Sequence, residues 1–258
     1  MPHPLKFFLP SLLTGFVLGA PAAARADEWT GSVSPTVVSR HIFRGQDRGG
    51  AALQTAIDFA NGDFGAGLWT SVPLEGSGPS SPGAEADLYV VQDIHLGGQL
   101  TLTSGATLYT YPRADRTLGF RRTTFEPSLA INGSFAGVSL TPKLSHDLNL
   151  EATTLEVAGV YALALPSFGT ELDFNGTTGT YLRRNEVSAF AGKTKAWGNY
   201  TQIGVSLPYQ VSHRTKLVVG WTYAVGSGAF IKPGAFPTTA DPRTTARGFA
   251  SLGCSTTF

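Results

Sequence analysis

The stretch that decides the fold is the last one, Gly248-Phe249-Ala250-Ser251-Leu252-Gly253-Cys254-Ser255-Thr256-Thr257-Phe258. Counting back in twos from Phe258 gives one face that is apolar or small: Thr256, Cys254, Leu252 and Ala250. The opposite face is small and polar: Thr257, Ser255, Gly253 and Ser251. This alternation is typical of the last strand of a transmembrane β-barrel, with one side toward lipid and the other toward a wet lumen. Many soluble strands alternate as well, so the prediction depends on the rest of the chain.

The beginning of the chain has the pattern of an export signal. Lys6 precedes an apolar run, Phe7–Ala20, and Ala24-Arg25-Ala26 fits an A-x-A cleavage site. The apolar run is short for a transmembrane helix. We therefore expect residues 1–26 to be a cleaved signal peptide and residues 27–258 to form one outer-membrane β-barrel domain. The signal peptide carries two positive charges, so its removal lowers the formal net charge from +1 to −1.

The composition favours a membrane protein without membrane helices. Only 14% of the residues are charged, against roughly 25% for a soluble domain. Nevertheless, no stretch after residue 26 has the ~20 apolar residues of a spanning helix. Only helices and closed barrels satisfy their backbone hydrogen bonds in lipid, so a barrel remains. The single cysteine, Cys254, excludes an intrachain disulfide framework. The near-zero net charge does not indicate nucleic-acid binding, and no motif indicates a cofactor.

Alternating segments recur along the chain, separated by turn residues. The twelve expected strands are Trp29–Val38, Ala52–Ala60, Phe64–Leu74, Glu85–Leu96, Leu100–Tyr111, Thr123–Ile131, Phe135–Ser145, Thr153–Leu165, Phe168–Asn175, Tyr200–Val211, Lys216–Val225 and Gly248–Phe258. The sequence therefore predicts an all-β fold, a single transmembrane antiparallel β-barrel of about twelve strands.

The connections between these strands alternate in length. Connections after odd strands are long and those after even strands are short, as in barrels with short periplasmic turns and long external loops. One of the short turns is expected at Asn132-Gly133-Ser134, because Asn and Gly tolerate positive φ. The largest excursion is residues 176–199, which could hide another hairpin, so ten or fourteen strands are alternatives.

Carboxylates fall on the presumed inward faces of the strands. The candidate pore-lining residues are Asp58, Glu85, Asp87, Asp93, Glu126, Lys143, Glu156, Glu171 and Asp173. Soluble barrels fill their lumen with apolar side chains, and burying so many acids in a dry core would be costly. We therefore expect a wet lumen whose acidic ring favours cations. Alternatively, the acids pair with basic residues of inward-folded loops, or form a network that fills a narrow barrel.

Two arginine-rich loops are candidates for a constriction. In residues 41–50, an inward-folded loop would let Arg44 pair with lumen acids such as Asp87, whereas the alternative is a turn at the barrel rim. The second loop, Pro112–Arg122, could constrict the lumen, bind lipopolysaccharide phosphates through guanidinium groups, or simply be solvated, which is the favoured interpretation. Its candidate residues are Arg113, Arg116, Arg121 and Arg122.

Three segments resemble the TorF family of bacterial outer-membrane porins. They are Ser39-Arg40-His41-Ile42-Phe43-Arg44-Gly45, Gly65-Ala66-Gly67-Leu68-Trp69-Thr70-Ser71 and Glu85-Ala86-Asp87-Leu88-Tyr89. The order and spacing match over His41–Pro112, although His41 stands where the family has Tyr. The resemblance implies a porin-like barrel in the bacterial outer membrane. It also implies that the barrel-assembly machinery recognises the C-terminal Phe258 as an assembly signal.

The sequence thus indicates a porin-like channel for passive diffusion of small hydrophilic solutes or ions, with cations preferred. A closed structural barrel is an alternative, and an outer-membrane enzyme is a less favoured one. Ser145-His146-Asp147 contains the residue types of a hydrolase triad, but neighbouring strand residues point to opposite faces. A metal site at Asp93 and His95 lacks an evident third ligand. We therefore expect neither catalysis nor a bound metal.

Overall fold

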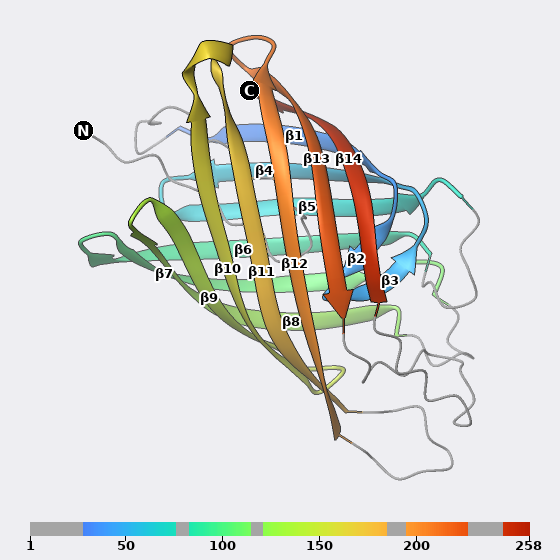
Figure 1. Ribbon diagram of the computed structural model, residues 1–258. Helices are drawn as coiled ribbons and strands as arrows, with labels where there is room; N and C mark the ends of the chain where they lie inside the picture. Colours follow the sequence, from blue (N-terminus) through green and yellow to red (C-terminus); the bar gives the residue numbers. More distant parts are fainter. Residues whose placement is uncertain (1–27, 76–82, 115–120, 185–194, 227–244) are drawn as a thin grey trace.

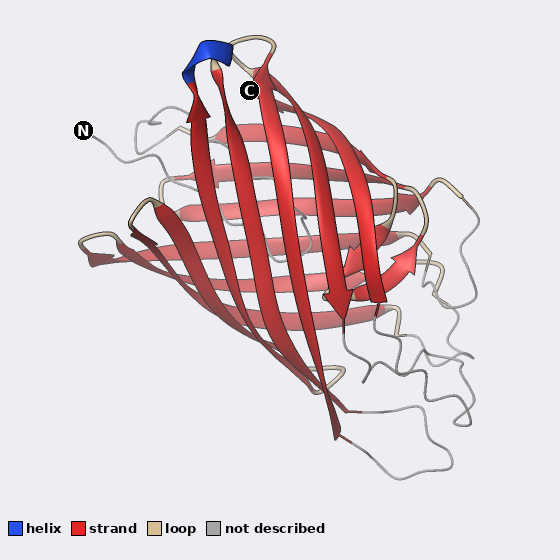
Figure 2. Cartoon of the chain, viewed as in Figure 1, coloured by secondary structure: helices blue, strands red, loops and turns tan. Residues whose placement is uncertain are grey.

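The computed structural model describes residues 28–75, 83–114, 121–184, 195–226 and 245–258, and twelve of its strands form a closed antiparallel barrel (Figures 1 and 2). The barrel strands are β1 (Thr30–Val38), β4 (Ala52–Asn61), β5 (Phe64–Pro73), β6 (Glu85–Gly97), β7 (Leu100–Thr110), β8 (Thr123–Phe135), β9 (Val138–Asp147), β10 (Ala152–Leu165), β11 (Thr170–Arg184), β12 (Lys195–Gln210), β13 (Thr215–Gly226) and β14 (Thr245–Thr257). The predicted fold class and strand number are confirmed. The predicted signal peptide, residues 1–26, lies outside the described residues.

Two further strands lie between β1 and β4. They are β2 (His41–Phe43) and β3 (Gln46–Gly49), which pair only with each other. We call residues 39–51, which contain both, the strap. β2 and β3 lie inside the barrel outline near one end (Figure 1), and Ile42, Phe43 and Arg44 are buried.

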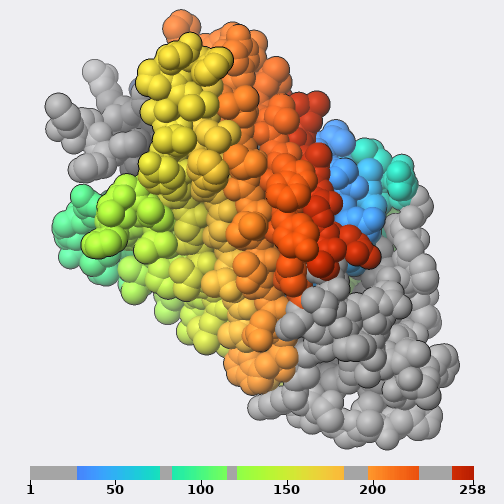
Figure 3. Space-filling view, viewed as in Figure 1, coloured from blue at the N-terminus to red at the C-terminus, as the bar shows by residue number. Residues whose placement is uncertain are grey.

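The burial pattern is the reverse of a soluble protein's. The inward residues of the strands are polar and buried, for example Ser34, Thr107 and Gln202, whereas outward residues such as Leu88, Val219 and Leu252 are exposed. Figure 3 shows the outer face over β10 to β14. An exposed apolar band around a polar interior is the arrangement of a transmembrane barrel. No helix among the described residues is long and apolar enough to cross a membrane.

Aromatic side chains gather on the outer face near the short turns. Trp29 packs edge-to-face on Phe64, with their ring centroids 6.2 Å apart. Phe59 packs in the same way on Phe258, at 6.3 Å. Exposed aromatic residues also include Phe135 and Phe168. Such a girdle is typical of the level of the membrane interface.

The barrel closes where β14 pairs with β1. The main chain of Phe258 exchanges two hydrogen bonds of 2.9 Å with that of Gly31. The Phe258 ring lies over Gly31, because a Cβ added there would stand 2.7 Å from its Cζ atom. The last residue therefore extends the closing seam, and its ring joins the aromatic girdle.

Connection lengths alternate as predicted at five of the six long connections, so the barrel has a short-turn end and a long-loop end. The exception is the connection between β9 and β10, residues 148–151, which is as short as those at 166–169 and 211–214. One short connection includes η2, a 3-10 turn at Pro166–Phe168, so β11 begins after Phe168 rather than at it. The prediction of a turn at residues 132–134 was wrong, since these residues belong to β8. The turn is Ala136-Gly137, with φ values of 49° and 83°. Asn132 instead bonds sideways to Thr103 at 2.7 Å and Thr141 at 2.9 Å.

The predicted excursion at residues 176–199 was also too long. β11 continues to Arg184 and β12 begins at Lys195, so only residues 185–194 lie outside the described strands. The segment lacks the apolar alternation of a typical strand, because its outward positions carry Gly176, Thr178 and Thr180 instead of apolar side chains.

Candidate functional site: the lumen and its strap

The strap crosses the lumen from the β1–β4 wall to the opposite side of the barrel. Ile42 clusters with Ala224 of β13 and Phe249 of β14. Phe43 packs on Tyr109 of β7, with ring centroids 6.3 Å apart. At the tip, a Cβ added to Gly45 would lie 2.7 Å from Gly226 Cα and from Tyr200 Cβ. The strap therefore narrows the lumen near the long-loop end.

A two-residue turn, Arg44-Gly45, forms the strap tip. Phe43 pairs with Gln46 across it, and φ is 47° at Arg44 and 73° at Gly45. Positive φ at both central residues suits a tight hairpin. It costs a non-glycine residue about 1 kcal/mol, so Arg44 needs contacts that hold it there.

Those contacts come from the far wall. Arg44 Nη1 and Nη2 donate to Glu126 Oε2 and Oε1, both at 2.8 Å, and Nη2 also reaches Ser145 Oγ at 3.3 Å. Tyr109 donates its hydroxyl to the same Glu126 carboxylate at 3.1 Å. Both side chains of the ion pair are almost fully buried. We call Arg44, Glu126 and Ser145 the latch.

Residues 41–50 therefore fold into the lumen, which is the inward-folded interpretation. The partner expected for Arg44, however, was wrong. Arg44 binds Glu126 on β8, not Asp87 on β6. The sequence could not distinguish these acids, because the crossing direction of the strap depends on its docking against Tyr109 and Ala224, not on local spacing.

Beneath the strap, against β5 and β6, polar groups are buried without satisfying all their hydrogen bonds. Trp69 pairs with Asp87 in register, and His41 lies over Trp69 with ring centroids 5.8 Å apart. Among the described residues, the buried side-chain atoms without a hydrogen-bond partner include His41 Nε2, Arg48 Nε, Trp69 Nε1, Glu85 Oε1 and both carboxylate oxygens of Asp87. Burial and the nearby Arg48 charge lower the pKa of His41 to about 3, so its ring is neutral at neutral pH.

Two lumen acids are held by tyrosines that lie across a glycine on the intervening strand. In the first row, Asp58, Gly67 and Tyr89 stand directly opposite one another on β4, β5 and β6. The Tyr89 hydroxyl donates to Asp58, and Ser32 adds a longer bond of 3.4 Å. A Cβ on Gly67 would lie 2.5 Å from Tyr89 Cζ, so only glycine leaves room for this ring.

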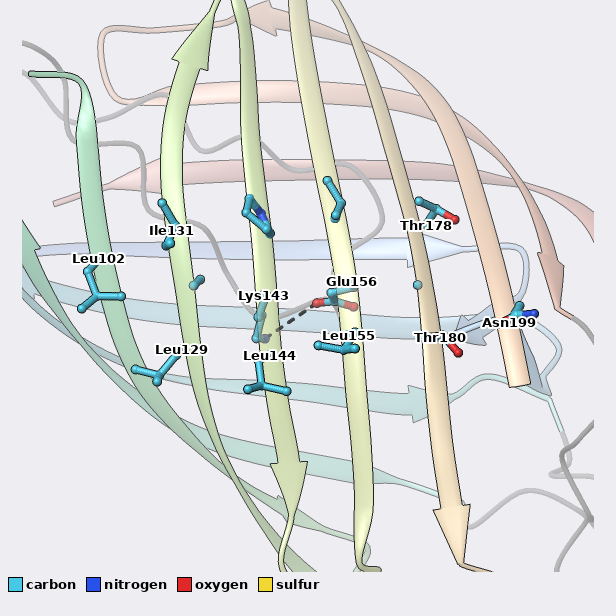
Figure 4. Close-up of a pocket in the computed structure, with 14 residues that line it drawn as sticks. Leu102, Leu129, Ile131, Lys143, Leu144, Leu155, Glu156, Thr178, Thr180 and Asn199 are labelled. Atoms are coloured by element: carbon cyan, nitrogen blue, oxygen red, sulfur yellow. Dashed lines mark ion pairs between the residues drawn. The ribbon is translucent and has the colours of Figure 1, made fainter. Parts of the chain in front are cut away.

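The second row repeats the arrangement with Glu156, Gly179 and Tyr200 on β10, β11 and β12. The Tyr200 hydroxyl donates to Glu156 at 2.5 Å, and a Cβ on Gly179 would lie 2.5 Å from Tyr200 Cζ. Glu156 also faces Lys143, whose Nζ is 3.9 Å from its Oε1 (Figure 4). The central strands of the two rows, β5 and β11, are separated by five strands in either direction, so the rows lie on opposite walls.

The other predicted lining residues lie on inward positions along the lumen. Asp93 accepts a 2.5 Å hydrogen bond from Thr103, and Asp173 is buried. Glu171 lies near the short-turn end with Lys216, both lining a hollow of about 310 Å³. The strand periodicity placed these acids, and Asp58 and Glu156, on inward positions, but it did not predict the tyrosines that bind Asp58 and Glu156. A glycine directly opposite both an acid and a tyrosine would have been the signal.

Three arginines of the second loop lie at the long-loop end. Arg113, Arg121 and Arg122 are exposed, and Arg122 Nε donates to the main-chain oxygen of Ala114 at 3.4 Å. Arg116 lies outside the described residues. In the described part of this loop, none of these side chains belongs to the latch.

The residues considered for catalysis and metal binding are separated or otherwise engaged. Ser145 and Asp147 face inward and belong to the latch and to a loop cap, respectively. His146 faces outward and contacts Thr153 Oγ1 at 2.9 Å, so this run forms no triad. His95 pairs with Asp63 at 3.1 Å rather than with Asp93. No group of three or more potential metal ligands occurs within the described ranges.

The outer wall is hollowed across β7 to β12 (Figure 4). The hollow has a volume of about 680 Å³, and its outward side chains include Leu129, Leu144 and Leu155 with Thr178 and Thr180. Thr178 bonds Thr201 at 3.1 Å and Thr180 bonds the Gly198 carbonyl at 3.3 Å. These hydroxyls in the apolar band therefore have partners within the barrel.

Solved porins share this fold. The NanC porin superposes with a TM-score of 0.53 at 12% identity, covering 88% of this chain and 98% of that chain. The KdgM porin gives 0.53 at 9% identity, covering 88% and 99%, and KdgM in complex with disordered oligogalacturonate gives 0.50 at 8%, covering 89% and 99%. No family model matches the chain, and no curated protein sequence is significantly similar to it. The chain therefore has a porin-type barrel fold, and its resemblance to TorF-family porins remains a prediction.

Proposed function

We propose that the protein is a porin-like channel of the bacterial outer membrane, through which small hydrophilic solutes or ions diffuse passively. The observation that carries this proposal is the inverted burial pattern, with polar side chains lining the interior of a closed barrel and apolar ones exposed outside. Such an interior is suited to water, because charged and hydroxyl groups would be costly in a dry core. The fold shared with porins supports the same function.

Cation preference follows from the local charge balance. Arg44 neutralises Glu126 and Lys143 faces Glu156. By contrast, Asp58 and Asp93 bind hydroxyl groups, and no ion pair involves either one in the described part of the chain. Carboxylates that no base neutralises attract cations into a pore and repel anions. We therefore propose that these two acids give the lumen its selectivity.

Two partners fit the ends of the barrel. The exposed Arg113, Arg121 and Arg122 would contact lipopolysaccharide phosphates at the long-loop end, where guanidinium groups bind phosphate bidentately. Phe258, on the closing seam, would be the residue that the barrel-assembly machinery recognises. Both partners presuppose that the long-loop end faces outside the cell, as in outer-membrane barrels.

A closed structural barrel is the second candidate, and the strap favours it. Its tip packs on Gly226 of β13 and Tyr200 of β12 and is latched to Glu126 on β8, so it obstructs the lumen near one end. By contrast, the inward positions Gly105, Gly204 and Gly220 add no side chain to the lumen. The side chains that lie over them include short and polar ones, namely Ser128, Asn175, Thr222 and Ser251.

Liposome swelling distinguishes the two candidates. Refolded protein is inserted into liposomes, which are then exposed to isotonic solutions of a neutral sugar, a cationic amine and a carboxylate of similar size. A channel with an acidic lumen admits the amine fastest and the carboxylate slowest. Swelling no faster than in protein-free liposomes, from protein shown to be inserted by its heat-modifiable migration, would favour the closed barrel.

A further inference from the structure

We propose that the strap is a gate with two positions, held across the lumen by the latch and able to leave it when the latch breaks. This inference deepens the proposed channel function and rests on it for its consequence, the change in conductance. The position of the strap itself can be tested without any current.

The first observation is that one charged residue carries the polar attachment of the tip. Arg44 makes three hydrogen bonds to the far wall, two of them to Glu126. Its backbone has a positive φ that non-glycine residues avoid. Without the Glu126 carboxylate, Arg44 would be a buried unpaired charge in a strained conformation. The docked tip would then lose its main polar contact, while the strained backbone and the buried charge of Arg44 would still destabilise it.

The second observation concerns the underside of the strap. His41 and Arg48 on the strap, and Trp69, Glu85 and Asp87 on the wall, bury polar atoms that lack hydrogen-bond partners among the described residues. A buried donor or acceptor without a partner disfavours the state that buries it. Because water would satisfy these atoms if the strap moved away, their missing hydrogen bonds favour the released position, whereas the attraction of Arg48 for Glu85 and Asp87 favours the docked one.

The third observation is the way the strap is connected. Its return arm contains Gly49 and Gly50, and Gly49 has a φ of 152° with no atom within 4 Å of an added Cβ. At its base, Arg40 pairs with Asp47 at 2.6 Å within the strap itself. The hairpin can therefore move as a unit about its two ends, with this internal pair intact.

The test uses thiol accessibility at the strap as a readout independent of conduction. Gln46→Cys is introduced beside the tip, and Cys254 is replaced by Ser so that the new thiol is unique. The barrel in lipid vesicles is treated with a small, water-soluble methanethiosulfonate reagent. Arg44→Met and Glu126→Gln should each raise the modification rate by about tenfold or more. The double variant should show no further increase, because the two residues act through one contact.

Arg40→Met is the matched control, since it removes an arginine ion pair of the strap that does not reach the wall, and its rate should stay near that of the parent. Ser145→Ala keeps the charges and loses one hydrogen bond, so a smaller increase is expected even if the charged variants fail to fold. The gate would be overturned if folded Arg44→Met and Glu126→Gln proteins were modified at rates within about twofold of the parent's. If only Ser145→Ala folds, a modification rate within about twofold of the parent's in that variant would overturn the gate.

Bilayer currents then separate the two claims. Faster modification together with larger or more frequent open states in Glu126→Gln supports both the gate and the channel. Faster modification with no current in any variant keeps the moving strap but rejects the proposed channel function. Steady parental current with unchanged modification rates keeps the channel and rejects the gate.

Discussion

Gly179→Ala is a sharp test of how the lumen wall is built. The added Cβ would lie 2.5 Å from Tyr200 Cζ, whereas ordinary contact begins near 3.4 Å. The Tyr200 ring must therefore move away and lose its hydrogen bond to Glu156. A hydrogen bond to a charged group contributes about 1.5–3 kcal/mol, so we expect the free energy of unfolding to fall by about 2 kcal/mol.

The measurement is equilibrium urea unfolding of the barrel in lipid vesicles, followed by tryptophan fluorescence. Gly159→Ala is the matched control, because its Cβ would meet Leu140 Cδ2 at 3.4 Å and needs no rearrangement. Its effect should stay within about 0.5 kcal/mol. In a Tyr200→Ala background, Gly179→Ala should cost nothing further. An equal loss in that background, or none in the parent, would refute the reasoning.

Three further predictions use other parts of the structure. Burial in the docked strap lowers the pKa of His41 to about 3 from an ordinary 6.5. The docked position should therefore lose stability as the pH falls below about 6.5, by up to about 30-fold at pH 5. The measurement is the rate of thiol modification at position 46, and His41→Asn should reduce its pH dependence. Asp58→Asn and Asp93→Asn should each lower cation selectivity in zero-current potentials, while Ser32→Ala should not. Deletion of Phe258 should lower the amount of assembled, heat-modifiable protein, because it removes two seam hydrogen bonds. Phe135→Ala, which changes another exposed girdle residue, should lower this amount less. An unchanged amount after the deletion would count against an assembly role.

The strand pattern could be predicted because each barrel strand repeats every two residues and lipid makes one face apolar. This periodicity placed Asp58, Asp93 and Glu156 on the inward face. It failed at Asn132, where a residue favoured in turns bonds across the lumen wall to Thr103 and Thr141. It also failed at Gly179, where a tyrosine from the next strand fills the space of a missing side chain.

The attachment of the strap could not be predicted, because it depends on contacts between residues far apart in the sequence. Arg44 and Glu126 are separated by 82 positions, and several other inward acids offered the same chemistry. What selected Glu126 is the path of the strap, set by Phe43 on Tyr109 and by Ile42 on Ala224 and Phe249.

The most direct test of the central claim is the current through single refolded barrels in a planar bilayer with a salt gradient. We expect discrete open states and a zero-current potential displaced toward the equilibrium potential of the cation, because unneutralised acids line the lumen. Inserted, heat-modifiable protein that carries no current, even with the latch removed by Glu126→Gln, would contradict the proposed channel.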